Sequence, residues 1–171
     1  RRYRYSTSLA FEKLERRELL ASVNGTDGSD YIYFITDWHD HSGTPEEHLI
    51  AIVQDIGSGS KNTQDLGDIG GIGSVTVRAG GGDDIVYGAP IRTILYGGSG
   101  DDKLLSMAAD TTIYGGPDMD ILIGSEFSDS LYGEGGNDLL YGNAGDDLLS
   151  DGNGDDRIYA GPGNNQVIPG S

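Results

Sequence analysis

The sequence contains a nine-residue pattern that repeats without a gap over residues 70–168. Its clearest copies are consecutive, occupy residues 133–159 and read GEGGNDLLY, GNAGDDLLS and DGNGDDRIY. The first four places hold mainly small residues, the sixth holds an aspartate and the eighth holds an aliphatic residue. A fixed period of this kind outranks local secondary-structure signals, and it predicts a repeat architecture in which each unit stacks on its neighbours.

Each nonapeptide is expected to form a six-residue turn followed by a three-residue β-strand. Glycines at the first, second and fourth places let the turn adopt backbone angles that other residues reach only at a cost. The eighth-place residues should form a thin core, because every one of them is aliphatic. They are Val77, Val86, Leu95, Leu104, Ile113, Leu122, Leu131, Leu140, Leu149, Ile158 and Val167.

The pattern G-G-x-G-x-D-x-U-x, with U aliphatic, resembles the calcium-binding nonapeptide of the RTX, or haemolysin-type, proteins. Residues 97–105 (GGSGDDKLL) and 142–150 (GNAGDDLLS) are close to that consensus. The resemblance covers more than half of the chain. It implies an all-β fold, a parallel β-roll in which two nonapeptides make one coil. Calcium ions would then lie between turns that are eighteen residues apart.

Alternate turns should therefore stack on two separate sides of the roll. On the first side every sixth-place residue is aspartate, namely Asp84, Asp102, Asp120, Asp138 and Asp156. On the second side the sixth-place residues are Val75, Thr93, Thr111, Asp129, Asp147 and Asn165. The expectation is four calcium ions on the first side and one on the second, about five Ca²⁺ in all. The early turns of the second side should hold none.

The family scheme implies which groups hold each ion. One turn gives the carbonyls of its second and fourth residues and its aspartate, and the next gives the carbonyls of its first and third residues and its aspartate. On the first side this covers Gly80, Gly82, Asp84, Gly97, Gly98, Ser99, Gly100, Asp102, Gly115, Gly116, Pro117, Asp118, Asp120, Gly133, Glu134, Gly135, Gly136, Asp138, Asp151, Asn153 and Asp156. On the second side it covers Ser125, Phe127, Asp129, Gly142, Ala144 and Asp147. Asp118 and Phe127 stand where the pattern has a fourth-place glycine.

The charge of the chain agrees with divalent cations as partners. The 28 acidic residues outnumber the 11 basic ones, and the net charge is −17. This excess argues against nucleic acid or an anionic membrane surface as a partner. There is no cysteine, so an exported chain of this kind would depend on metal rather than disulfides for extra stability. No apolar run approaches the length of a membrane span.

Residues 1–23 form a basic N-terminal segment whose first twenty residues carry a net charge of +3. The composition of residues 9–20 indicates a short amphipathic helix or a frayed tail. The stretch FEKLERRELLASV also resembles the LEPR-type N-terminal segment of large bacterial extracellular proteins, with arginine in place of that family's proline. This resemblance implies a role in export or sorting.

Residues 24–69 are expected to form a small β cap that covers the first rung of the roll. One isolated copy of the repeat, GTDGSDYIY, occupies residues 25–33. Residues 31–36 and 48–54 favour two strands, which form a hairpin, and residues 57–73 are typical of a loop. The roll itself is assigned to residues 70–168.

A local cluster in the cap admits two interpretations. Asp37, His39, Asp40, His41 and His48 could form a zinc or copper site, because alternate strand residues share one face. The solvated face of an edge strand explains the same residues equally well.

Together these features favour a secreted or cell-surface bacterial calcium-binding β-roll, a structural or adhesive module rather than an enzyme. Two alternatives stay open. The chain could be the C-terminal calcium-binding portion of a larger secreted protease, lipase or epimerase, since it begins without methionine. Alternatively, a roll surface could bind carbohydrate through Tyr96, Tyr114 and Tyr132, which are eighteen residues apart. A cell-surface or polysaccharide partner would fit the adhesive role and the carbohydrate-binding role.

Overall fold

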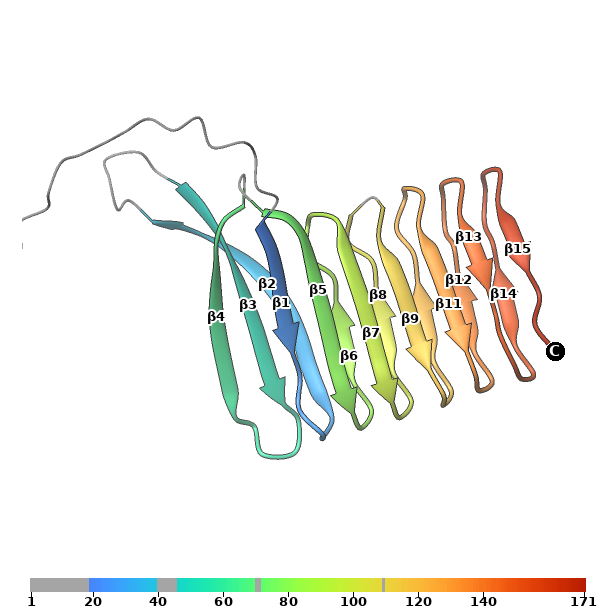
Figure 1. Ribbon diagram of the computed structural model, residues 1–171, viewed down its shortest axis with the longest axis horizontal. Helices are drawn as coiled ribbons and strands as arrows, with labels where there is room; N and C mark the ends of the chain where they lie inside the picture. Colours follow the sequence, from blue (N-terminus) through green and yellow to red (C-terminus); the bar gives the residue numbers. More distant parts are fainter. Residues whose placement is uncertain (1–18, 40–45, 70–71, 109) are drawn as a thin grey trace, which may run out of the picture.

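The fold contains β-strands and no helix in the residues that the computed structural model describes, which are 19–39, 46–69, 72–108 and 110–171. The strands form two sheets that face each other and run along the whole molecule (Figure 1). From β5 onward the chain alternates between the sheets, one strand in each, and so winds as a flat solenoid. The predicted all-β fold, a parallel β-roll, is confirmed.

The first sheet, called sheet A, has seven parallel strands. In spatial order they are β1 (Leu19–Asn24), β5 (Ile72–Gly81), β7 (Thr93–Ser99), β9 (Thr112–Gly116), β11 (Ser130–Glu134), β13 (Leu148–Ser150) and β15 (Gln166–Ile168). Sheet B has eight strands. They are β14 (Arg157–Tyr159), β12 (Leu139–Tyr141), β10 (Ile121–Ile123), β8 (Lys103–Leu105), β6 (Ile85–Tyr87), β2 (Asp30–His39), β3 (Glu46–Asp55) and β4 (Lys61–Asp68).

The strand register follows the eighteen-residue coil. Leu122 pairs with Leu104 on one side and with Leu140 on the other, and the same spacing holds in sheet A. The eighth-place side chains point between the sheets, and those from Val77 to Leu149 are fully buried. The core thins at the C-terminal end, where Val167 is 44% exposed. The predicted core column is therefore confirmed, and its stacking sets the position of every turn.

The isolated repeat belongs to the solenoid as its first coil. Strand β1 pairs in parallel with β5, and β2 pairs in parallel with β6. Val23 and Ile32 extend the two core columns and are buried. Residues 25–29 form the turn between β1 and β2, in the place that the repeat turns occupy further along. The division at residues 23 and 69 stays a prediction, but the solenoid begins before residue 24.

The hairpin predicted within the cap is confirmed. Strands β2 and β3 pair antiparallel along their whole length, and Leu49 and Ala51 join the same core as Val23. The loop expected over residues 57–73 is wrong in part, because β4 pairs antiparallel with β3 there. Its sequence, KNTQDLGD, is polar and mostly exposed, as suits a strand at a sheet edge. Tertiary pairing thus overrides weak local propensity.

The N-terminal segment meets the described chain at Leu19. A short helix or a frayed tail was expected over residues 9–20, but β1 already begins at Leu19 because it pairs with β5. Residues 1–18, with the LEPR-like stretch that they contain, lie outside the described residues. No helix among the described residues is long and apolar enough to span a membrane.

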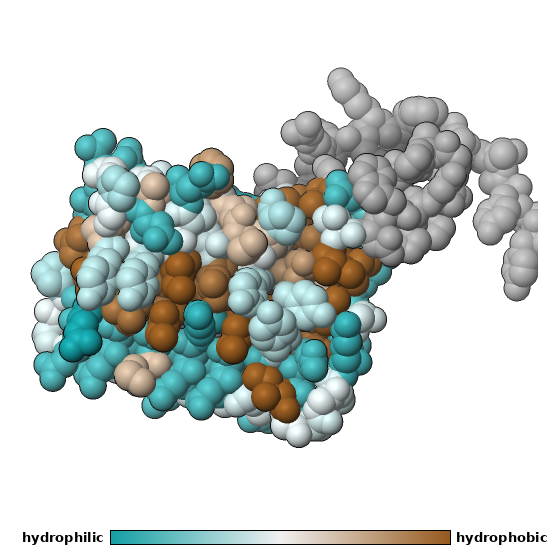
Figure 2. Space-filling model, turned by 180° about the vertical axis from the view of Figure 1, so that it is seen from behind, coloured by the Kyte–Doolittle hydropathy of each residue, from teal (hydrophilic) through white to brown (hydrophobic). Residues whose placement is uncertain are grey.

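The outer face of sheet B carries a band of hydrophobic side chains along its middle (Figure 2). The band includes half-buried residues of four successive strands, which are Ile85, Leu105, Ile121, Ile123 and Leu139. Hydrophilic residues line the edge of this face below the band. In β6, β10 and β12 a fully buried residue thus lies between two partly buried ones.

Two neighbouring leucines test the core column. Leu140 is fully buried between the sheets, whereas Leu139 lies on the outer face of the same strand. We expect Leu140→Ala to lower the free energy of unfolding in saturating calcium by about 3 kcal/mol, because it leaves a cavity. Leu139→Ala, the matched control, should cost about 1 kcal/mol or less. Equal losses in urea unfolding would contradict the assignment of the inner face.

Candidate calcium sites

Tight turns join each strand of sheet A to the next strand of sheet B, and several of these strands extend into the residues predicted as turn. The turns that end at Asp30, Asp84, Asp102, Asp120, Asp138 and Asp156 lie in a row, which we call the acidic edge. It is the edge at which the arrows of sheet A end in Figure 1. The turns that lead back from sheet B to sheet A form the opposite edge. The predicted two-sided arrangement of the turns is thus present in the fold.

The glycine framework brings successive turns into direct backbone contact. Gly80 and Gly82 have φ angles of 116° and 96°, in the region that L side chains rarely adopt. A Cβ on Gly98 would overlap the carbonyl oxygen of Gly80, and one on Gly100 would lie 2.5 Å from that of Gly82. The second- and fourth-place carbonyls of each turn therefore face the following turn, as the predicted ligand scheme requires.

Along the acidic edge the aspartates form a hydrogen-bonded column. The backbone amide of each aspartate donates to Oδ1 of the aspartate eighteen residues later. From Asp84 to Asp156 these distances are 2.8, 2.8, 2.9 and 2.7 Å. Asp84, Asp102, Asp120 and Asp138 are all buried. The hydrogen bonds of the column satisfy Oδ1 of each acceptor carboxylate but not Oδ2.

The second carboxylate oxygen has no partner within the protein. Oδ2 of Asp84, Asp102, Asp120 and Asp138 is buried and accepts no hydrogen bond. A buried carboxylate oxygen without a partner is strongly unfavourable. A divalent cation between the turns would remove this cost.

Main-chain oxygens lie close to these orphaned atoms. A Cβ on Gly97 would overlap Oδ2 of Asp102 and would lie 2.6 Å from the carbonyl oxygen of Gly115. The same holds at Gly115, with Asp120 and Gly133. No group of three or more His, Cys, Asp or Glu side chains suited to a metal occurs in the described part of the chain. Carboxylate and main-chain carbonyl oxygens together are the ligands that hard Ca²⁺ accepts.

The electrostatics of the column also favour a cation. Burial raises the pKa of Asp84 to about 7, of Asp102 to about 6, of Asp120 to about 8 and of Asp138 to about 6. Neighbouring carboxylates add to the rise, and the hydrogen bond from the adjacent backbone amide opposes it. Without a metal the folded column therefore binds protons at a higher pH than free aspartates do, and calcium would compete with those protons.

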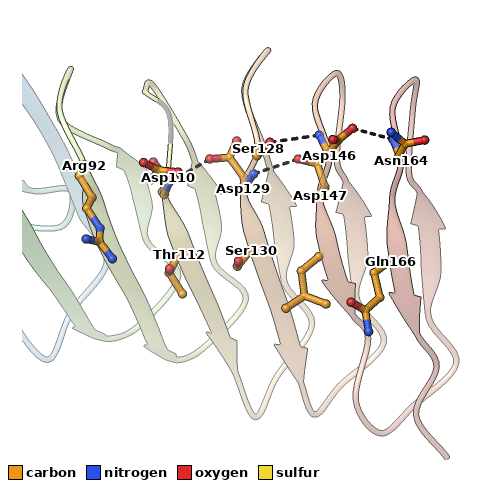
Figure 3. Close-up of a pocket in the computed structure, with 12 residues that line it drawn as sticks. Arg92, Asp110, Thr112, Ser128, Asp129, Ser130, Asp146, Asp147, Asn164 and Gln166 are labelled. Carbon is orange, nitrogen blue, oxygen red and sulfur yellow. Dashed lines mark hydrogen bonds between the residues drawn. The ribbon is translucent and has the colours of Figure 1, made fainter.

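The opposite edge has one pair of stacked aspartates, Asp129 and Asp147, which Figure 3 shows next to each other. The amide of Asp129 donates to Oδ1 of Asp147 at 2.9 Å, and Oδ2 of Asp147 is buried without a partner. Burial also raises the pKa of Asp147. Oδ2 of Asp129, in contrast, accepts from the amide and hydroxyl of Ser125. Beyond the pair, Asp147 donates its amide to Asn165 at 2.9 Å.

The early turns of the opposite edge are held by their own hydrogen bonds. The hydroxyl of Thr93 donates to the carbonyl of Ile91 at 2.7 Å, and that of Thr111 donates to Ala108 at 3.0 Å. Both threonines are buried. These contacts are the ones expected of turns without metal. The absence of calcium there stays a prediction.

Asp118 and Phe127 replace glycine at the fourth place of their turns. Their backbone angles differ from those of the glycines, but their carbonyl oxygens occupy similar positions. Asp118 and Phe127 do not adopt positive φ angles. Even so, a Cβ on Gly136 would overlap the carbonyl oxygen of Asp118, and one on Gly145 would lie 2.5 Å from that of Phe127. Both carbonyls therefore still face the next turn.

At second places, the left-handed conformation persists without glycine. Glu134 has a φ angle of 76° and Asn143 one of 66°. These residues keep the turn shape despite the strain that a side chain brings at such angles.

Sequence reasoning missed one member of the column. Asp84 was expected to end the stack, but the amide of Asp30 donates to its Oδ1 at 2.5 Å. Asp30 is fully buried and lies 54 residues earlier in the chain. That separation is a multiple of nine, so residues 25–33 keep the period of the roll across the inserted hairpin. This shared phase was the signal in the sequence.

The Asp/His cluster in the cap is only partly described. Residues 40–45, and the side chains of Asp37 and His39, lie outside the described residues. Nδ1 of His48 lies 3.0 Å from Oδ2 of Asp65, so this histidine contacts a carboxylate of β4.

Stacked turns with orphaned carboxylate oxygens and inward carbonyls define a calcium-binding β-roll. The chain belongs to the RTX calcium-binding nonapeptide repeat family, which it matches in four copies over residues 69–90, 94–113, 114–149 and 141–171. These ranges cover more than half of the chain. Comparison with curated proteins and with solved structures gave no match. RTX repeats bind calcium, and the donor set found here fits that ion.

The acidic column predicts which aspartates matter most for calcium. Asp120 lies between two neighbours of the column, whereas Asp156 is its last member. Because asparagine keeps the Oδ1 acceptor but removes the charge, we expect Asp120→Asn to lower the number of bound calcium ions by up to two. Asp156→Asn should remove at most one.

The exposed neighbour provides a control. Asp101 also accepts a backbone amide, that of Met119, but lies on the surface. Asp101→Asn should leave the calcium count unchanged in isothermal titration calorimetry. A loss at Asp101 equal to that at Asp120 would argue against the buried column as the ligand set.

The raised pKa values predict opposite pH dependences with and without calcium. The folded pKa values exceed the unfolded value of about 3.9. In calcium-free buffer the protonated column therefore stabilises the fold fully below about pH 4, and this contribution is lost as the pH rises through 6 to 8. We expect a clear thermal unfolding transition at pH 5 and a lower or absent one at pH 8. With saturating calcium the order should reverse, because protons compete with the metal. A calcium-free midpoint that rises with pH would contradict the assignment.

Proposed function

We propose that the chain is a secreted or cell-surface β-roll of bacterial origin, which folds when it meets extracellular calcium and serves as a structural or adhesive module without enzymatic activity. The observation that supports this proposal is the column of buried carboxylates, each with one unpartnered oxygen. Such a column is stable only with protons or cations. At neutral pH a divalent cation is the effective partner. RTX repeats are also typical of bacterial extracellular proteins.

The free energy of calcium binding is large enough to supply the stability that a thin hydrophobic core lacks. Extracellular calcium modules have dissociation constants of about 10⁻⁴ to 10⁻³ M. At about 1 mM free calcium, a site at the tighter end stabilises the fold by about 1.4 kcal/mol. We propose about five such sites, which would together contribute about 7 kcal/mol, comparable to the whole stability of a domain. At sub-micromolar calcium this contribution vanishes.

The tyrosine column supports a packing role rather than sugar binding. Tyr96, Tyr114 and Tyr132 stack with ring centroids 5.0 and 4.9 Å apart and planes within 10° of each other. Arg78 continues this column beyond Tyr96, with its guanidinium 5.2 Å from the ring centre of Tyr96. The ring faces within the column, and the outer face of Tyr96, are therefore covered by neighbours. Sugars stack on exposed ring faces, so this column favours the structural proposal.

The proposal is tested by following secondary structure against calcium. In chelator at pH 7.5, far-ultraviolet circular dichroism should show little β structure, and in millimolar calcium it should show a strong β signal. Magnesium at the same concentration should have much less effect, because it keeps its water and demands octahedral geometry. A chain that is equally folded in chelator would overturn calcium-coupled folding.

A further inference from the structure

The turn of the first coil has the features of a metal site that the family match does not cover, since that match begins at residue 69. Asp30 is 0% exposed, and its Oδ1 has no hydrogen-bond partner. Its other oxygen accepts from the amide of Thr26 at 2.5 Å. On the facing turn, Oδ2 of Asp84 is also buried without a partner. Each of these two stacked turns therefore contains a buried aspartate with one unpartnered carboxylate oxygen.

The backbone of these two turns repeats the contacts seen further along the acidic edge. A Cβ on Gly25 would overlap the carbonyl oxygen of Ala79 and lie 2.7 Å from Oδ2 of Asp30. A Cβ on Gly80 would overlap the carbonyl oxygen of Thr26, which also accepts the amide of Gly81 at 3.1 Å. Gly97 and Gly98 make the equivalent contacts in the next turn of this edge, residues 97–102.

We propose that a calcium ion binds between residues 25–30 and residues 79–84 and fastens the N-terminal hairpin to the roll. Asp30 and Asp84 would supply the carboxylates, and the carbonyls of Thr26, Gly28, Ala79 and Gly81 would complete the set. This inference rests on the proposed function, because it assigns the same ion to one further pair of turns. It adds an ion beyond the five expected from the contiguous repeats.

The consequence of this site is a cross-link between segments that are distant in sequence. The other sites join turns eighteen residues apart, but Asp30 and Asp84 are separated by 54 residues. The turn at residues 25–30 also contacts the hairpin directly, since the amide of Ile56 donates to the carbonyl of Ser29 at 2.8 Å. Closing the longer loop costs more entropy. The hairpin should therefore be the part that loosens first as calcium is withdrawn.

The test uses Asp30→Asn in the full chain, with Asp27→Asn as the matched control. Asp27 lies in the same turn but is exposed. In calorimetry, Asp30→Asn should bind one calcium ion fewer than the wild type, and Asp27→Asn should bind the same number. In hydrogen exchange at millimolar calcium, the amides of β2 and β3 should lose protection in Asp30→Asn, while those of β10 and β12 keep it.

The outcomes separate this inference from the proposed function. A wild-type chain that neither binds calcium nor folds in response to it would contradict the proposed function itself. A calcium-folded wild type whose Asp30→Asn variant keeps the full ion count would overturn only the hairpin site. If the variant does not fold, anomalous diffraction from lanthanide-soaked wild-type crystals decides. A peak between Asp30 and Asp84 supports the site, and peaks confined to the later turns refute it.

Discussion

The structure depends on a column of buried carboxylates that repel one another. Their spacing is set by strand pairing, about 4.8 Å per rung, and the core behind them is one aliphatic side chain deep on each sheet. The backbone amides of neighbouring turns satisfy one oxygen of each aspartate, as at Asp102 and Asp120. The remaining oxygens need a cation or a proton. The same contacts that build the roll thus make it conditional on its surroundings.

The glycines matter because they allow this column to form at all. At Gly98 and Gly116 any side chain would overlap the carbonyl of the preceding turn. At these two positions the turns can therefore approach to one strand spacing only with bare backbone, whereas Glu134 keeps the same turn shape in a left-handed conformation. Close approach in turn brings carbonyl oxygens next to the carboxylates. Packing and metal chemistry are in this way two results of one steric requirement.

Much of this could be predicted from the sequence, because a strict period carries both the fold and the site. The eighth-place aliphatic residues gave the core, and the sixth-place residues gave the two unequal edges. The period could not reveal β4, whose residues are polar and which is a strand only because β3 pairs with it. The place of Asp30 was missed for a related reason. Its stacking partner is chosen by sheet pairing across an inserted hairpin, not by sequence neighbourhood.

The hydrogen bonds of the column all point the same way along the roll. Each donor belongs to the earlier turn and each acceptor to the later one, as from Asp120 to Asp138. The two ends of the column are therefore chemically unlike. At the C-terminal end of the column the last backbone amide, that of Asp156, lacks a later aspartate as acceptor among the described residues, and water can satisfy this neutral group easily. At the N-terminal end of the column the first aspartate, Asp30, has a carboxylate oxygen with no earlier amide to act as its donor. At that end Oδ1 of Asp30 is buried without a donor, because the amide of Thr26 bonds to the other oxygen, Oδ2.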